Sequence, residues 1–101
     1  MIYYFHPEAR LEYREATMFY EQRRPGLGAA YTLEVEATLK RIVEAPERWR
    51  IIEQDVRRCL THTFPFGVLY TIEPNSILIL AVMNLRRKPD YWRSRLSSPS
   101  S

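Results

Sequence analysis

Basic and aromatic side chains are concentrated near the end of the chain. Five of the ten residues from Arg86 to Arg95 are Arg or Lys, and Tyr91 and Trp92 lie among them. Guanidinium groups bind phosphate and carboxylate through paired hydrogen bonds, and they also stack on bases. This segment therefore predicts a surface that binds a phosphate-bearing or acidic partner. With two cations from an earlier strand added, the predicted target-binding residues are Arg57, Arg58, Arg86, Arg87, Lys88, Tyr91, Trp92 and Arg93.

The same residues are also candidates for metal-free cleavage of RNA. That reaction needs a base for the 2′-hydroxyl, a cation beside the developing phosphorane and an acid for the 5′-oxygen. Arg86 and Arg87 would supply cations, and Tyr91 or His62 would transfer protons, but no residue is convincing as the base. His62 falls in a predicted strand, where a structural or exposed role is the simpler interpretation. Catalysis by Arg86, Arg87 and Tyr91 is therefore kept as the alternative to binding alone.

The composition predicts one small globular domain. The chain has 101 residues, 46% of them hydrophobic and 27% charged, which allows a single core. Cys59 is the only cysteine, so no internal disulfide is possible, and no metal-ligand spacing is evident; no metal or cofactor is expected. The absence of a long apolar run and of a signal-peptide pattern predicts a cytoplasmic protein without a membrane partner. We expect the domain to span residues 1–96, followed by a disordered tail at 97–101.

Positive charge belongs to the second half of the chain. The net charge is +3, and 13 of the 15 cations are Arg. Residues 1–56 hold 8 Lys and Arg against 10 Asp and Glu, whereas residues 57–101 hold 7 against 2. Because the basic field is confined to one half, it favours a site for an acidic or phosphate-bearing partner there.

Helical patterns dominate the first half. A short aromatic strand over residues 2–5 is expected to stop at His6-Pro7, where proline suits the first turn of a helix and His6 a capping or packing role. A helix over 8–23 then ends at Pro25-Gly26, and a second helix is expected from about 27 to 44. Since the break between them is short, the helices should form an antiparallel hairpin. The second helix places four apolar side chains on one stripe: Tyr31, Val35, Leu39 and Ile42.

Strand patterns dominate the second half. Residues 46–54 are expected to form a connection, and period-two alternation begins at Asp55 and continues to Phe64. Residues 66–72 alternate as a strand, and 77–83 form an apolar run that predicts a strand buried on both faces. The predicted fold is α+β in the order β-α-α-β-β-β. It comprises an N-terminal strand, the helical hairpin, a three-stranded antiparallel meander and a short helical turn around residues 90–96.

Four stretches of this sequence resemble the RelE/ParE superfamily of bacterial toxins from type II toxin–antitoxin modules. They are Phe64-Pro65-Phe66-Gly67-Val68-Leu69-Tyr70, the apolar strand from Ile77 to Val82, Arg86-Arg87-Lys88-Pro89-Asp90-Tyr91-Trp92, and the opening His6-Pro7-Glu8-Ala9. The likeness covers roughly residues 2–95. It implies a toxin that a co-expressed antitoxin neutralises.

The resemblance implies one of two activities. RelE-like members cleave mRNA on the ribosome, and Arg86 or Arg87 matches their arginine after the last strand, as Tyr91 or Trp92 matches their nearby aromatic position. However, a further catalytic arginine of RelE-like enzymes is matched here by Gly67, and their lysine pair has no match. ParE-like members poison DNA gyrase and lack that catalytic set. The leading hypothesis is therefore a ParE-like toxin that binds a cellular target, with gyrase as the best candidate.

Two alternatives and one partner follow from the same residues. The runner-up is a RelE-like, ribosome-dependent mRNA endonuclease, and the third hypothesis is a non-enzymatic nucleic-acid-binding module whose basic residues contact phosphates. In either toxin hypothesis the chain forms a hetero-oligomer with its antitoxin. An acidic, amphipathic antitoxin segment would contact the outer face of the helical hairpin and the sheet end at Arg57, Arg86 and Trp92.

Overall fold

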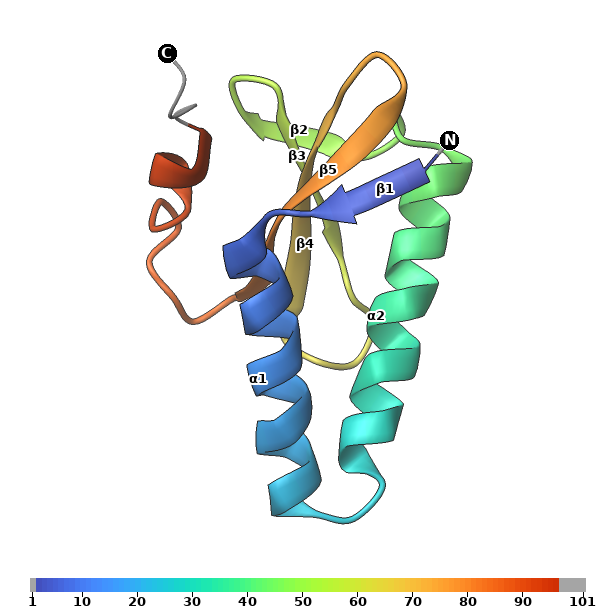
Figure 1. The fold of residues 1–101 in the computed structure, drawn as a ribbon, viewed down its shortest axis with the longest axis vertical. Coiled ribbons are helices and arrows are strands. Elements are labelled where there is room, and N and C mark those ends of the chain that lie inside the picture. The colour runs from blue at the N-terminus through green and yellow to red at the C-terminus, as the bar shows by residue number, and fades with distance from the viewer. Residues whose placement is uncertain (1, 97–101) are drawn as a thin grey trace.

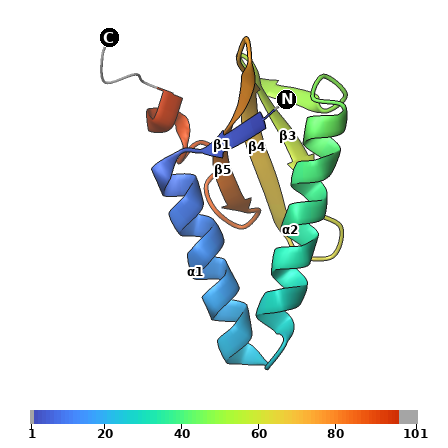
Figure 2. The ribbon, with the colours of Figure 1, turned by 45° about the vertical axis from the view of Figure 1, so that its right-hand side comes forward.

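The computed structural model describes residues 2–96, which form a five-stranded sheet with a helical hairpin on one side (Figures 1 and 2). The predicted disordered tail at residues 97–101 lies outside the described residues. No helix in the described range is long and apolar enough to cross a membrane. In chain order the elements are β1 (Ile2–Phe5), α1 (Pro7–Arg23), α2 (Leu27–Glu44), β2 (Arg50–Glu53), β3 (Val56–Leu60), β4 (Phe66–Ile72), β5 (Ser76–Asn84) and the 3-10 helix η1 (Arg93–Leu96).

The sheet has the order β1-β5-β4-β3-β2. Strands β2 to β5 form an antiparallel meander, whereas β1 pairs in parallel with β5, from Ile2 opposite Ser76 to Phe5 opposite Ile79. The predicted α+β class and the order of the helices are confirmed. The predicted three-stranded meander is wrong by one strand, because β2 precedes it.

Strand β2 was assigned to a connection because it lacks the pattern of a half-buried strand. Its sequence Arg50-Ile51-Ile52-Glu53 does not alternate, and as an edge strand it pairs with β3 alone. A tight turn with a positive φ of 51° at Gln54 leads into β3. The strand predicted from Asp55 to Phe64 is also too long at its C-terminal end, since β3 ends at Leu60.

The main core lies between the helices and the sheet. The predicted stripe of α2 is confirmed, because Tyr31, Val35, Leu39 and Ile42 are each at most 1% exposed. They pack with apolar residues of β4 and β5, and partly buried aromatic side chains of α1 close the cluster. Each fully buried large side chain contributes about 1.5–3 kcal/mol, so this stripe supplies much of the stability of a small domain.

A second, smaller core lies on the opposite face of the sheet. There Trp92 packs against Val56 of β3 and against apolar residues of β4 and β5. Strand β5 therefore lies between two apolar layers, and all but one of the residues from Ile77 to Met83 are buried. This confirms the prediction that the run is buried on both faces.

The two helices approach closely near the hairpin turn. A Cβ atom at Gly28 would lie 2.7 Å from the carbonyl oxygen of Thr17 and 2.9 Å from Cβ of Glu21. The carboxylate of Glu21 also accepts hydrogen bonds from the N–H groups of Gly26 and Gly28, at 3.1 and 3.0 Å. Gly28 is thus required for the distance between the helices, whereas Gly26, with φ of 89°, provides the turn.

Replacement of Gly28 by Ala should destabilise the fold by about 1–3 kcal/mol, because the clash with backbone of α1 exceeds the gain in helix propensity. Urea unfolding of the purified chain measures this change. Gly26→Asn is the comparison: its positive φ strains the backbone, but a Cβ there meets nothing within 4 Å, so any loss it shows comes without a clash between the helices. Equal stability of the Gly28→Ala variant and the parent chain would contradict the close helix approach.

Candidate target-binding site

The C-terminal segment (residues 85–96) follows β5 and folds back onto the sheet. Its Trp92 is 1% exposed, and the indole N–H donates to the carbonyl of Pro89 at 2.7 Å. Trp92 was predicted to contact a target, but in this fold its side chain is covered by the sheet. Its apolar ring instead holds the C-terminal segment against β3, β4 and β5.

The carboxylate of Glu12 on α1 holds the other side of the segment. Its oxygens accept two hydrogen bonds from the guanidinium of Arg95, each 2.9 Å long, and the Tyr91 hydroxyl also donates to it. The N–H of Val82 donates to Glu12 at 3.0 Å. The side chains of Glu12 and Arg95 are only 13% and 9% exposed, so this is a mostly desolvated ion pair. We call Glu12, Val82, Tyr91 and Arg95 the Glu12 cluster.

The Glu12 cluster provides hydrogen-bond partners for backbone groups of β5 that β1 does not reach. Strand β1 pairs with β5 only as far as Ile79, so no strand of residues 2–96 lies beside the next part of that edge. There the carbonyl of Leu80 accepts a hydrogen bond from Arg95 at 3.1 Å, and the N–H of Val82 is bound by Glu12. Two side chains thus take the place of a longer strand.

The hydroxyl of Tyr91 is bound within this cluster. Burial raises the pKa of Tyr91 above the ordinary value for a phenol, and the hydrogen bond to Glu12 raises it further. The guanidinium carbon of Arg87 lies 3.9 Å from the centre of the Tyr91 ring, and that of Arg95 lies at 5.0 Å. The phenol is therefore protonated at neutral pH, with its proton directed at a carboxylate.

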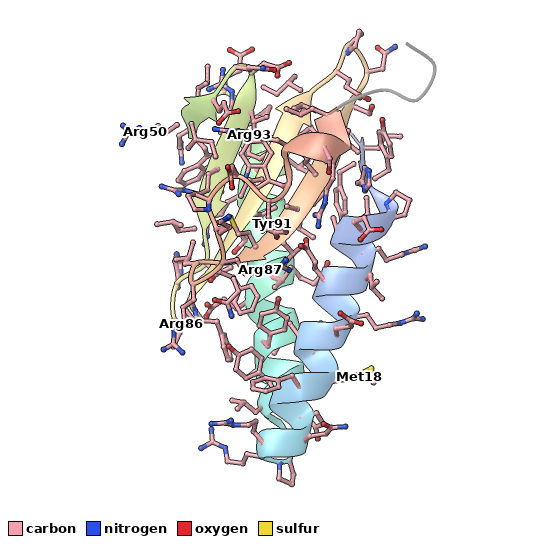
Figure 3. All side chains as sticks on the ribbon, turned by 90° about the vertical axis from the view of Figure 1, so that its left-hand side faces the viewer. Met18, Arg50, Arg86, Arg87, Tyr91 and Arg93 are labelled. Atoms are coloured by element: carbon pink, nitrogen blue, oxygen red, sulfur yellow. The ribbon has the colours of Figure 1, made fainter. Side chains whose placement is uncertain are left out.

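The predicted cations point in different directions. Figure 3 shows Arg86 projecting into solvent, whereas Arg87 points toward α1. Arg93 forms a forked ion pair with Glu53, at 2.6 and 2.7 Å, although it remains exposed. Arg57 lies on the helix-covered face, where it donates to the carbonyl groups of Glu47 and Trp49 at 3.0 and 2.8 Å. It supports the loop before β2.

Part of the predicted set does converge on the face opposite the helices. Arg58, Lys88 and Arg93 line a hollow of about 360 Å³, which we call the C-terminal hollow. The side chain of Arg58 runs across Gly67, because a Cβ at that glycine would lie 3.1 Å from Cδ of Arg58. Gly67 thus makes room for the side chain of an arginine from the neighbouring strand.

The sequence model described as "ParE toxin of type II toxin-antitoxin system, parDE" matches residues 3–89. The chain belongs to the ParE toxin family. A solved structure titled "Chromosomal ParDE TA system from P. aeruginosa" superposes with a TM-score of 0.76 at 16% identity, covering 85% of this chain and 97% of that one. A comparison with curated proteins gives no match. The predicted membership of the RelE/ParE superfamily is confirmed.

The two histidines of this ParE-family chain lie apart from the C-terminal hollow. His6 caps α1, since its Nδ1 accepts a hydrogen bond from the N–H of Glu8 at 3.1 Å, as predicted. His62 accepts a hydrogen bond at Nε2 from Arg41, at 2.8 Å. Within residues 2–96, no group of three or more His, Cys, Asp or Glu side chains is arranged to hold a metal ion.

Sequence reasoning missed Glu12, Glu53 and Arg95. Glu12 offered one signal, because it falls between Ala9 and Ala16 on the stripe of α1 that faces the core, where a charge requires a partner. Its partner, Arg95, was counted only as one of many cations. Glu53 offered no signal, since its strand was not predicted.

Glu12→Gln should destabilise the ParE-family fold by about 2–4 kcal/mol, because it leaves the mostly buried Arg95 without its charge partner. Tyr91→Phe should cost about 1–2 kcal/mol, since it removes one hydrogen bond to the same carboxylate. Denaturant unfolding measures both changes. Glu15→Gln is the matched control on the exposed side of the helix and should change stability by less than about 0.5 kcal/mol. Equal stability of the Glu12 and Glu15 variants would show that the cluster does not hold the segment.

Proposed function

We propose that this chain is a ParE-like toxin that arrests growth by binding DNA gyrase in the cytoplasm, and that a cognate antitoxin neutralises it. The proposal is supported by membership of the ParE toxin family. The observation that carries it is the engagement of Tyr91 by Glu12, which leaves exposed cations on the C-terminal segment while the tyrosine's proton is already bound by a carboxylate.

The geometry favours target binding over RNA cleavage. Of the three candidate catalytic residues, Tyr91 donates to Glu12, Arg87 stacks on the Tyr91 ring and only Arg86 projects freely. A tyrosine with a raised pKa is a weaker acid, and its proton is already bound by a carboxylate. The engagement of Tyr91 and the outward direction of Arg86 therefore support target binding rather than catalysis.

The proposed gyrase-binding surface consists of the cations of the C-terminal hollow and of Arg86, which lies two residues before Lys88. Arg86 and Lys88 are exposed and make no ion pair within residues 2–96, and Arg58 and Arg93 line the hollow with Lys88. Unpaired exposed guanidinium groups raise the association rate with an acidic protein or nucleic-acid surface. Gyrase in its DNA-bound state offers both kinds of surface.

The purified chain should inhibit supercoiling by gyrase, and Arg86→Glu should raise the required toxin concentration at least ~10-fold, because a reversed charge is repelled by the acidic partner. Supercoiling and DNA-cleavage assays measure this. Arg14→Glu, the same change on the exposed face of α1, is the control and should have little effect.

Other outcomes would favour the other hypotheses. Full gyrase activity at a large excess of the wild-type chain would refute gyrase poisoning. Cleavage of mRNA on translating ribosomes, lost in Tyr91→Phe, would establish the RelE-like endonuclease. Salt-sensitive binding to any nucleic acid without growth arrest would favour the non-enzymatic nucleic-acid-binding module.

The proposed antitoxin site is a groove between α1 and the end of β5. It has a volume of about 300 Å³, and its apolar lining includes Ala16, Phe19, Tyr20 and Val82. Its charged lining consists of Glu12, Glu15 and Arg87. Phe19 is 53% exposed, although it is a large apolar side chain. An amphipathic antitoxin segment would cover this ring and place an acidic residue near Arg87. The outer face of the hairpin, predicted from sequence, remains the competing surface.

Phe19→Ser should weaken antitoxin binding by about 10- to 100-fold, because it removes an aromatic contact from the groove. Leu33→Ser is the matched comparison, since Leu33 is 72% exposed on α2. Calorimetry with the co-expressed antitoxin measures both affinities. A greater loss for Leu33→Ser would instead locate the antitoxin on the outer face of the hairpin.

A further inference from the structure

A second basic hollow lies at the corner of the sheet where β2 begins beside the end of β3. We call it the corner hollow, and its volume is about 510 Å³. It shares Arg58 with the C-terminal hollow but is otherwise formed by different residues. Among the described residues no Asp or Glu lines it. Its polar and aromatic lining consists of Arg41, Trp49, Arg50, Arg58, Thr61 and His62.

Two of these arginines face each other without a counterion. Arg50 and Arg58 are direct partners in the β2–β3 pair, so both side chains extend from the same face. Like charges at opposed positions of antiparallel strands repel each other. Neither takes part in an ion pair within residues 2–96, and Figure 3 shows Arg50 projecting from the sheet edge. An anion bound between these guanidinium groups would remove the repulsion.

The third arginine is oriented by the fold. Arg41 of α2 donates from Nη2 to the carbonyl of Leu60 at 3.0 Å and from Nη1 to Nε2 of His62 at 2.8 Å. Because Nε2 of His62 accepts this bond, the ring proton is on Nδ1, which is a further donor. The Nε atom of Arg41 and the indole nitrogen of Trp49 are buried and have no hydrogen-bond partner within residues 2–96. Two N–H groups at this corner therefore lack an acceptor among the described residues.

We propose that the corner hollow binds a phosphate group. A carboxylate has two oxygens and one charge, whereas a phosphate offers more acceptor oxygens and up to two charges, which better matches three arginines and an imidazole. Trp49 lies near the guanidinium groups of Arg41 and Arg48, with ring distances of 5.9 and 5.8 Å, and keeps this basic surface together. The phosphate belongs to a free nucleotide or to a nucleic-acid strand that passes the open corner.

The test titrates the full chain with three probes: pyrophosphate, a free nucleotide and a short fluorescently labelled DNA duplex. Tryptophan fluorescence follows the first two, since Trp92 is buried and Trp49 lies at the hollow, and anisotropy follows the third. Arg50→Glu should weaken binding of the active probe at least ~10-fold and, for DNA, lower the salt slope by about 1. Arg14→Glu makes the same charge change on α1 and should alter affinity by less than about 3-fold, because the charge is distant and screened.

The outcomes distinguish a free nucleotide from a nucleic-acid strand as the source of the phosphate. Binding of the nucleotide without the duplex assigns the hollow to a free nucleotide, and binding of the duplex assigns it to a nucleic-acid strand. Failure of all three probes, an equal loss in both variants, or binding of an acidic peptide such as polyglutamate alone overturns the proposal. Because the assay contains no gyrase, its result is independent of the proposed gyrase poisoning.

Discussion

The carboxylate of Glu12 connects three parts of the chain that are far apart in sequence. It lies on α1, and it binds the backbone of Val82 in β5 and the side chains of Tyr91 and Arg95 in the C-terminal segment. Strand β1 is too short to cover the full edge of β5, so the remaining N–H and carbonyl groups need other partners. A single acidic residue on the adjacent helix meets that need and positions the basic segment. The shape of the candidate site therefore depends on an interaction within the core.

The cations of the C-terminal segment fall into two groups with different roles. Arg87, Arg93 and Arg95 contact an acidic or aromatic side chain, and they hold the segment in place. Arg86 and Lys88 have no ion-pair partner among residues 2–96, so the fold does not depend on their charge. Exposed charges of this kind contribute little to stability but act strongly on association. Substitution of Arg86 or Lys88 can therefore test a role in binding without unfolding the domain.

Regular patterns made most of the fold predictable, and non-local pairings made the rest unpredictable. The second helix was predicted with its observed ends because a clear apolar stripe and a following Ala45-Pro46 define it. Strand β2 was missed because an exposed edge strand has no alternation to detect. The sequence also located the basic segment but not the directions of its side chains. Trp92 is covered and Tyr91 is bound because Leu80 and Glu12, distant in sequence, lie beneath them.

The relation between Gly67 and Arg58 shows how a residue without a side chain lets a neighbouring strand supply the charge on a sheet face. A side chain at position 67 would project from β4 into the face opposite the helices, on the same side as Leu69. Here that face receives a guanidinium from β3 instead, which reaches across the glycine and is shared by two hollows. Because this arginine is attached to β3, its guanidinium reaches the face from another direction than a side chain of β4 would. The missing side chain at Gly67 therefore determines from which strand the positive charge of this face comes, without any change in the sheet that carries it.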